Sequence, residues 1–337
     1  MKNLTTEYMG LKLKNPIIAG ASSLTSDLNS IREIEAAGAA AIVTKSLFEE
    51  QIQLQNYRDE LEHERTEEKH AEMITVFPDL KFDGAKEHLH WVKRTKETVK
   101  IPVIGSLNAV SREAWLDYAQ QLAQTGIDGL ELNFYSTPND FSKSGASLED
   151  EQIALLKEIV SKLSIPVSVK LSSDYTNPLH VIKQMSKTGI AGVVLFNRFF
   201  QPDINIEKME NTFPFNLSTP HDYGHTLRYT GLLSQQIDAQ ICSSGGIFGA
   251  ADVIKMILAG ANAVQMVSVL FTYGIEHIKI ILSDLEAWMN KNGYKSLADF
   301  QGKMNKVNNT DPWAYGRSQY VRLLMKPQLL HRDKIEF

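Results

Sequence analysis

The chain has 337 residues, with 35 Lys and Arg against 40 Asp and Glu, and a formal net charge of -5 at pH 7. This mildly acidic balance argues against a nucleic-acid-binding surface, because such a surface needs clustered basic residues. Cys242 is the single cysteine, which excludes an intrachain disulfide and a cysteine-rich metal or iron–sulfur site. Because Cys242 lies within an apolar run, we expect it to be a small buried core residue.

The N-terminal segment is polar. It reads MKNLTTEYMGLKLKNP, which does not fit a signal peptide, and no apolar run of the sequence approaches the length needed to span a bilayer. We therefore expect a cytoplasmic protein that has neither a membrane nor a nucleic acid as its partner.

Short apolar runs alternate with helical patterns along most of the chain. The predicted strands are residues 16–20, 40–44, 102–106, 129–133, 166–171, 192–196, 239–243 and 263–267. The predicted helices are residues 27–37, 84–99, 112–124, 148–163, 178–188, 224–236, 250–258 and 273–291. Continuous apolar strands indicate burial on both faces, as in parallel sheets. Eight strands, each followed by a helix, predict an α/β fold of the (β/α)8 TIM-barrel type.

Three segments do not fit the strand–helix repeat. Residues 48–83 follow the second strand, residues 199–223 follow the sixth, and residues 297–337 form a C-terminal tail. Because both insertions follow strands, we expect them at the mouth of the barrel, where such enzymes place lids. We predict a barrel over residues 1–300 and an extension over residues 301–337 that packs on it.

The segment over residues 241–268 carries the strongest functional signal. A strand runs into Ser243-Ser244-Gly245-Gly246, a helix follows, and the next strand ends at Val267-Ser268. Paired glycines let backbone N–H groups approach an anion. Two consecutive strand ends of this kind are typical of the phosphate site after strands 7 and 8 of a TIM barrel, and a βαβ unit of a doubly wound sheet is the alternative.

Polar residues gather at the other predicted strand ends, where the functional side chains of a barrel lie. A lysine such as Lys170, inside the apolar run over residues 167–171, needs an anionic or polar partner unless its amine reaches solvent. Lys45 likewise needs an anionic or polar partner unless its amine reaches solvent. The strand ends also contribute Ala19, Gly20, Ala21, Ser46, Asn108, Asn133 and Asn197.

The chain resembles the dihydroorotate dehydrogenases, and in particular the soluble class 1 enzymes. The similarity extends over about residues 4–300 and is carried by an ordered set of motifs. These are GLKLKNP at 10–16, TKS at 44–46, ELN at 131–133, VKL at 169–171, SGGI at 244–247 and GANAVQ at 260–265.

The resemblance implies FMN at the barrel mouth and assigns roles to single residues. Small side chains at Ala19, Gly20 and Ala21 would pass beneath the flavin ring, and Lys170 would lie near its N1/O2 edge, where a positive charge stabilises the anionic reduced flavin. Lys45 would contact both the flavin ring and the substrate, and it would be one of the catalytic residues. The other implied cofactor contacts are Ser46, Asn108, Asn133, Gly245, Gly246, Val267 and Ser268, and the implied substrate contacts are Asn133 and Asn197.

The chain departs from the family pattern where the proton-abstracting base is expected. The family has Ser-Cys-Pro-Asn or Ser-Ser-Pro-Asn after its Glu-Leu-Asn element, and the residue before proline is the base. Here the segment reads NFYSTPN over residues 133–139, one residue longer. Counting from Asn133 puts Ser136 at the base position, whereas counting back from Pro138 puts Thr137 there. Either hydroxyl needs polarisation or a water relay to act as a base.

The substrate loops differ as well. The Asn-rich loop that holds orotate after strand 2 is replaced by EMITVFP at 72–78, and the glycine-rich stretch after strand 6 is replaced by residues 199–223. The resemblance therefore supports flavin binding by this chain better than it supports dihydroorotate as the substrate.

Several functions remain open at this point. The first is oxidation of (S)-dihydroorotate to orotate in pyrimidine biosynthesis, with an external electron acceptor. Another flavin-barrel activity on a different dihydropyrimidine or an enone-type substrate is the second. A phosphate-binding aldolase or isomerase that uses Lys170 or Lys45 as a Schiff-base amine is the third, and a catalytically silent family member is the fourth. We expect a homodimer. We also expect no metal site, because the nine histidines show no convincing ligand spacing.

Overall fold

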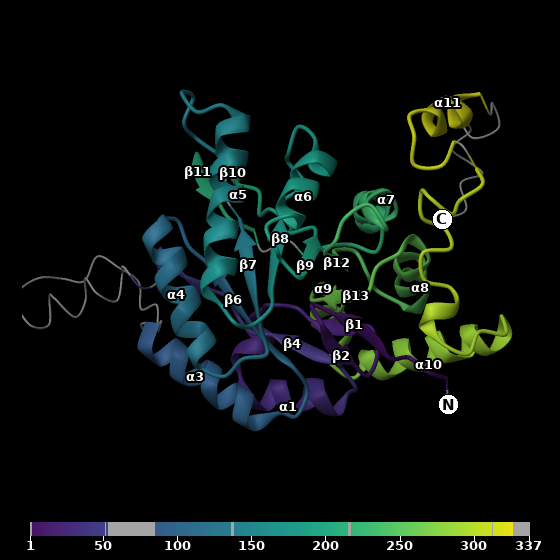
Figure 1. The fold of residues 1–337 in the computed structure, drawn as a ribbon, viewed down its shortest axis with the longest axis horizontal. Coiled ribbons are helices and arrows are strands. Elements are labelled where there is room, and N and C mark those ends of the chain that lie inside the picture. The colour runs from purple at the N-terminus through teal and green to yellow at the C-terminus, as the bar shows by residue number, and fades with distance from the viewer. Residues whose placement is uncertain are drawn as a thin grey trace, which may run out of the picture.

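The computed structural model describes residues 2–50, 52, 85–135, 138–214, 217–311 and 313–325. Its centre is a closed ring of parallel strands (Figure 1), in the order β4–β3–β13–β12–β9–β8–β7–β6, with β4 pairing with β6 to close it. The strands are β3 (Ile17–Ala19), β4 (Ala41–Val43), β6 (Val103–Asn108), β7 (Gly129–Phe134), β8 (Val167–Leu171), β9 (Gly192–Leu195), β12 (Gln240–Ser244) and β13 (Ala263–Met266). Each of the eight predicted strands is confirmed, and the fold is the predicted TIM barrel. The short strand β5 (Leu47–Phe48) extends the wall by pairing with β6.

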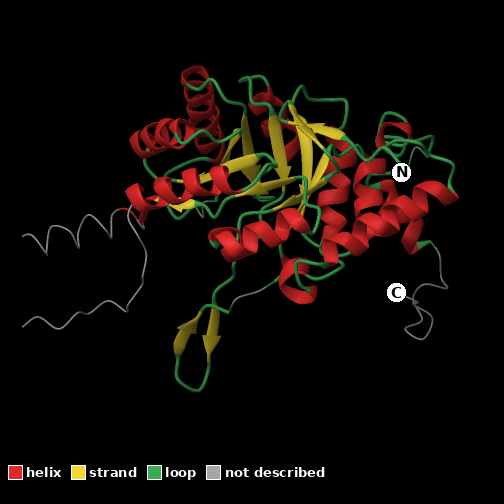
Figure 2. Cartoon of the chain, turned by 90° about the horizontal axis from the view of Figure 1, so that it is seen from below, coloured by secondary structure: helices red, strands yellow, loops and turns green. Residues whose placement is uncertain are grey.

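Helices surround the strands as an outer ring (Figure 2). They are α1 (Leu28–Ala36), α3 (Ala85–Thr98), α4 (Arg112–Gln124), α5 (Gly145–Lys162), α6 (Pro178–Ser186), α7 (Tyr223–Leu233), α8 (Ala250–Ala259), α9 (Ser268–Tyr273) and α10 (His277–Lys291). The predicted single helix over residues 273–291 is wrong at its start. Gly274 has φ +84° and ends α9, so that α10 begins only at His277. α5 begins three residues before the predicted start because the Ser144 side chain caps it.

The barrel interior has its own core, which the N-terminal hairpin closes from below. The hairpin pairs β1 (Thr6–Tyr8) with β2 (Leu11–Leu13), and Tyr8 is fully buried. Tyr8 packs among interior strand residues that include Val194 and Cys242, so the expectation of a buried cysteine is confirmed. A second, larger core fills the space between the strands and the helical ring.

Two of the three segments outside the repeat are described. After β9, β10 (Asp203–Asn205) and β11 (Glu210–Thr212) form an antiparallel hairpin that projects from the barrel (Figure 2). The C-terminal segment contains η2 (Leu297–Asp299) and α11 (Ser318–Leu324), and its Met304 amide donates to the Leu258 carbonyl of α8. Most of the first insertion, residues 53–84, lies outside the described residues, as does its predicted place over the mouth.

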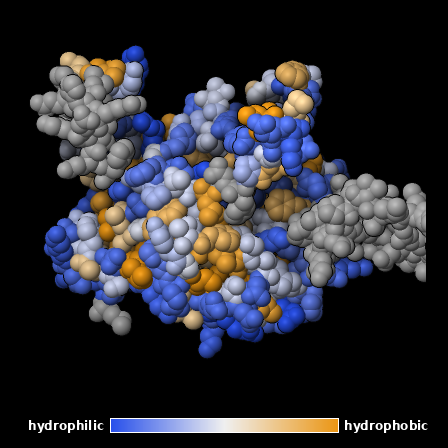
Figure 3. Space-filling model, turned by 180° about the vertical axis from the view of Figure 1, so that it is seen from behind, coloured by the Kyte–Doolittle hydropathy of each residue, from blue (hydrophilic) through white to orange (hydrophobic). Residues whose placement is uncertain are grey.

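The surface is mixed in character. Hydrophilic residues cover most of the face seen in Figure 3, with smaller hydrophobic groups between them. Within the described part of the chain, the helices are either too short or too polar to cross a bilayer.

The close approach of Gly192 to Tyr8 makes a testable prediction about packing. A Cβ at Gly192 would lie 2.8 Å from the Tyr8 hydroxyl and 2.9 Å from two ring carbons. Gly192→Ala should therefore lower the free energy of unfolding by about 1–3 kcal/mol, the usual cost of overpacking, in urea denaturation. Gly145→Ala is the control, since nothing lies within 4 Å of its Cβ position. Equal stability of the two variants would contradict the tight packing of the hairpin.

Candidate active site

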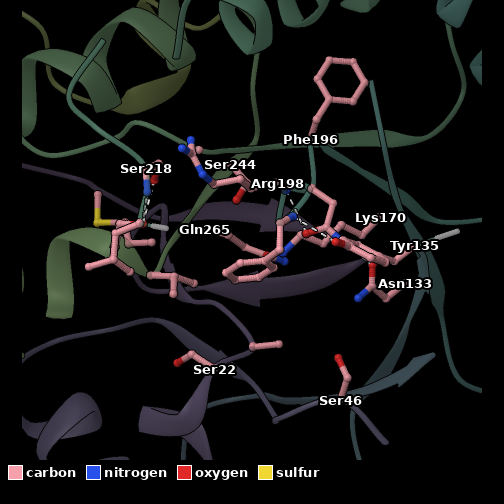
Figure 4. Close-up of a pocket in the computed structure, with 18 of the residues that line it drawn as sticks. Ser22, Ser46, Asn133, Tyr135, Lys170, Phe196, Arg198, Ser218, Ser244 and Gln265 are labelled. Carbon is pink, nitrogen blue, oxygen red and sulfur yellow. Dashed lines mark hydrogen bonds between the residues drawn. The ribbon is translucent and has the colours of Figure 1, made fainter. Parts of the chain in front are cut away.

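A cavity of about 450 Å³ opens at the carboxyl ends of the strands (Figure 4). Ten of the sequence-predicted site residues line it. They are Ala21, Lys45, Ser46, Asn133, Lys170, Asn197, Gly245, Gly246, Val267 and Ser268. Because these residues come from seven different strand ends or the loops after them, the closed barrel is what brings them together.

Three predicted residues lie behind the cavity wall. Ala19 is fully buried in β3, and the Gly20 amide donates to the Met266 carbonyl at 3.0 Å. Asn108 is 5% exposed and its amide donates to the Asn133 carbonyl at 2.9 Å. Ser136 and Thr137, the two candidates for the base, lie outside the described residues.

The loop after β12 and the start of α9 form one end of the cavity, which we call the anion cradle after the glycine-rich turns that it resembles. Gly245 and Gly246 have φ values of +90° and +68°, a conformation that favours glycine. A Cβ at Gly246 would meet the backbone of Asp222 at 2.8 Å, so no other residue fits there without a shift of the chain. Ser268 completes the cradle, and its hydroxyl oxygen accepts from the Ser218 amide at 2.9 Å.

A chain of hydrogen bonds crosses the cavity floor from Lys170 to Glu131. The Lys170 Nζ donates to Gln265 Oε1 at 3.2 Å, and Gln265 Nε2 donates to Glu131 Oε2. An ammonium needs an acceptor and a carboxylate needs a donor, so this is the orientation of the Gln265 amide that satisfies both neighbours. Lys170 is 7% exposed and thus a buried cation with partners, rather than a side chain that reaches solvent.

Glu131 is fully buried, and its Oε1 has no hydrogen-bond partner among the described residues. Burial raises the pKa of this carboxyl, while the Lys170 charge and the Gln265 hydrogen bond act against the rise. A buried carboxylate is costly unless it is paired, so Glu131 holds the Gln265 amide that binds Lys170 at a cost in stability.

Asparagine side chains line one wall of the cavity. The Asn197 amide donates to Asn133 Oδ1 at 2.6 Å, which joins the ends of β9 and β7. Tyr135 follows β7 and its hydroxyl accepts from the Phe200 amide at 2.9 Å. This wall therefore offers amide groups and an aromatic face of the kind that orient a small polar ring.

Lys45 and Ser46 lie on the opposite wall. The Ser46 hydroxyl is 2.6 Å from that of Ser106, and burial lowers the pKa of Lys45. His88 of α3 is affected by the same lysine. Burial and the Lys45 charge lower the pKa of His88 to about 4, so its imidazole is neutral at pH 7.

Sequence reasoning missed several residues of the site. Glu131 and Gln265 stood in the quoted motifs without a role, although each lies two residues before a strand-end residue and so points to the same side of its strand. Arg198 and Ser218 lie beyond strand ends in segments that carry no motif. Tyr135 stood in the quoted segment over residues 133–139 without a role. Among the described residues, no group of His, Cys, Asp or Glu side chains is arranged to hold a metal ion.

Comparison with known proteins gives one consistent picture. The family model of dihydroorotate dehydrogenase matches residues 3–289. The catalytic subunit of dihydroorotate dehydrogenase B (NAD(+)) from Thermoplasma acidophilum is 27% identical over 311 residues, covering 90% of this chain and 99% of its own. Dihydroorotate dehydrogenase A (fumarate) from Limosilactobacillus reuteri is 27% identical over 310 residues, with coverages of 88% and 97%. Chloroplastic dihydropyrimidine dehydrogenase (NADP(+)) from Arabidopsis thaliana is 19% identical over 328 residues, with coverages of 89% and 76%.

The buried Glu131 makes stability depend on pH in a definite direction. The pKa of Glu131 is raised in the folded state. Its contribution to the free energy of unfolding is therefore fully present below pH 4.5, the ordinary pKa of a glutamate, and is lost as the pH rises through its pKa in the folded protein. Glu131→Gln has no such proton to lose. The free energy of unfolding of the variant minus that of the wild type should grow with pH, by at most about 1.4 kcal/mol per unit.

Urea unfolding at a series of pH values measures this difference. Asp150→Asn, which changes an exposed carboxylate on α5, is the control and should keep the wild-type slope. Parallel stability curves for the wild type and Glu131→Gln would contradict the burial cost assigned to Glu131.

Proposed function

Because this chain belongs to the dihydroorotate dehydrogenase family, we propose that it is an FMN-dependent dehydrogenase acting on a carbon–carbon single bond, with (S)-dihydroorotate as its substrate and orotate as its product in pyrimidine biosynthesis. The observation that carries the proposal is the layout of one cavity. It joins the anion cradle at Gly245 and Gly246 to the buried Lys170 ammonium on its floor.

The described residues fit FMN. The cradle suits a phosphate, since Gly245 and Gly246 both have positive φ and the backbone of Asp222 lies too close to Gly246 for a side chain there. The cavity volume of about 450 Å³ lies within the range of roughly 300–1,000 Å³ that small-ligand sites have. Bound FMN supplies two-electron oxidation chemistry, and the protein supplies binding, orientation and charge.

The residues of the chain take distinct roles in this proposal. With FMN bound, Lys170 would hold a positive charge on the cavity floor, and such a charge stabilises the negative charge that a flavin gains on reduction. Asn133 and Asn197 orient the substrate, and Lys45 contacts ring and substrate. Ser136 takes the proton from the substrate carbon, with Thr137 as the alternative, because spacing from the strand end at Asn133 is held by the barrel and spacing to a loop proline is not.

A different dihydropyrimidine is the second candidate substrate. Two observations favour it. The family's substrate loop is replaced by residues 72–78 in this sequence, and one relative is named as a dihydropyrimidine dehydrogenase. We further propose that the protein acts in the cytoplasm, as a homodimer, with an external electron acceptor.

Lys170 is the first residue to test. Lys170→Met should bind FMN at least about tenfold more weakly and lower the reduction potential of the bound flavin, because the negative charge gained on reduction loses its counter-charge. Fluorescence titration of the flavin-free protein and anaerobic redox titration measure the two quantities. Lys183→Met, an exposed lysine on α6, is the control. A variant with an unchanged potential would place Lys170 away from the ring.

The substrate and the base are tested together by anaerobic reduction of the bound flavin. Dihydroorotate should reduce the wild type, and Ser136→Ala should slow this step by about a hundredfold or more, as loss of a positioned base does. Thr137→Val should have much less effect. Reversed effects would make Thr137 the base. Reduction by dihydrouracil but not by dihydroorotate would favour the second substrate, and a protein that binds no flavin would contradict the proposed function.

A further inference from the structure

The segment after β9 folds back over the anion cradle. The Ser218 hydroxyl lies 2.7 Å from the Ser268 hydroxyl, and the backbone of Asp222 lies against Gly246. The Asp222 side chain turns back to accept from the Thr219 amide at 2.8 Å. Residues 217–222 therefore form one wall of the cradle, although they belong to an insertion in which the sequence shows no phosphate motif.

Arg198 reaches this wall from the end of β9. Its backbone amide donates to the Asn197 side chain at 3.0 Å, and its Nη1 donates to Asp222 Oδ2 at 2.6 Å. Because the Asp222 backbone contacts Gly246, this ion pair places the guanidinium at the cradle end of the cavity. Figure 4 shows Arg198 beside Ser244, on the side of the pocket where Ser218 also lies. Arg198 lines the same cavity as Gly245, Gly246 and Ser268.

The other described cations of the cavity are committed elsewhere. Lys170 is bound to Gln265 on the floor, and Lys45 follows β4. Backbone N–H groups offer only partial charges, whereas a phosphate monoester carries close to two negative charges at neutral pH. A planar guanidinium matches phosphate geometry and can donate two parallel hydrogen bonds. Asp222 holds the guanidinium in place and its own charge is neutralised by the pair.

We propose that Arg198 is a phosphate-binding residue of this cavity, held at the cradle by Asp222, and that it selects a flavin with a terminal phosphate over one without it. The inference rests on the proposed function, because the ligand is the flavin of that proposal. It adds a charged side chain from the insertion after β9 to a cradle otherwise made of backbone and hydroxyl groups.

The experiment compares FMN with riboflavin, which has the same ring and ribityl chain but no phosphate. Dissociation constants for both are measured by fluorescence titration of the flavin-free protein. The wild type should bind FMN more tightly than riboflavin. Arg198→Met should weaken FMN binding by about 10- to 100-fold, as loss of a charge-assisted contact of about 1.5–3 kcal/mol does, and should leave riboflavin binding within about twofold.

Two further variants make the comparison specific. Arg198→Lys keeps the charge but not the planar fork, so its loss of FMN affinity should be intermediate, and it tests the proposal if Arg198→Met does not fold. Lys162→Met is the matched control. Lys162 is a cation of α5 that pairs with Glu158 at 2.9 Å and does not line the cavity, so both ligands should bind as in the wild type.

Each contrary result has a separate meaning. Equal weakening of FMN and riboflavin in Arg198→Met would overturn the proposal, because it would show a contact with the ring or a general loss of structure. Unchanged FMN binding would overturn it as well. A wild type that binds neither flavin would contradict the proposed function itself, whereas a wild type that binds both equally would contradict only the phosphate contact.

Discussion

The site depends on a buried ammonium that the barrel has to satisfy from within. Lys170 lies at the end of an apolar strand with little access to solvent, so the protein has to supply partners for its charge. The compensation comes from Gln265 on β13 and Glu131 on β7, two strands that are far apart in the sequence. The strand register is thereby fixed by chemistry as well as by packing, since a slip of one residue would turn each of these side chains out of the barrel.

The residues that line the cavity come from two different parts of the chain. Its floor and its glycine cradle belong to the barrel strands and to the short loops after them, which the fold positions rigidly. Its outer wall belongs to the segment after β9, with Arg198, Ser218 and Asp222. The residues of this outer wall can therefore change while the barrel strands beneath them keep their positions.

The barrel could be predicted from the sequence because each strand is a continuous apolar run and each helix an amphipathic one. Gly38, Gly126, Gly189 and Gly260 mark the helix ends, and each has the positive φ that such an end requires. The sequence also predicts that Lys170, Asn133 and the glycine pair lie close together, since the strand ends of a barrel meet at one face. The break at Gly274 did not, because the helical pattern continues across it. Arg198 was equally hidden, because a loop residue reaches a site through tertiary contacts that no periodicity records.

The N-terminal hairpin has a consequence for how the protein is made. The Thr6 hydroxyl donates to the Asn262 carbonyl, and the Gly10 amide donates to Gln240, across separations of 256 and 230 residues. These partners leave the ribosome long after the hairpin does, because synthesis proceeds from the N-terminus. The ring of Tyr8 has no native cavity to enter until β12 and β13 exist, so a segment synthesised well before its partners is among the last to reach its place. Contacts of such separation slow folding, because the entropy of closing so long a loop is lost before the contact can form.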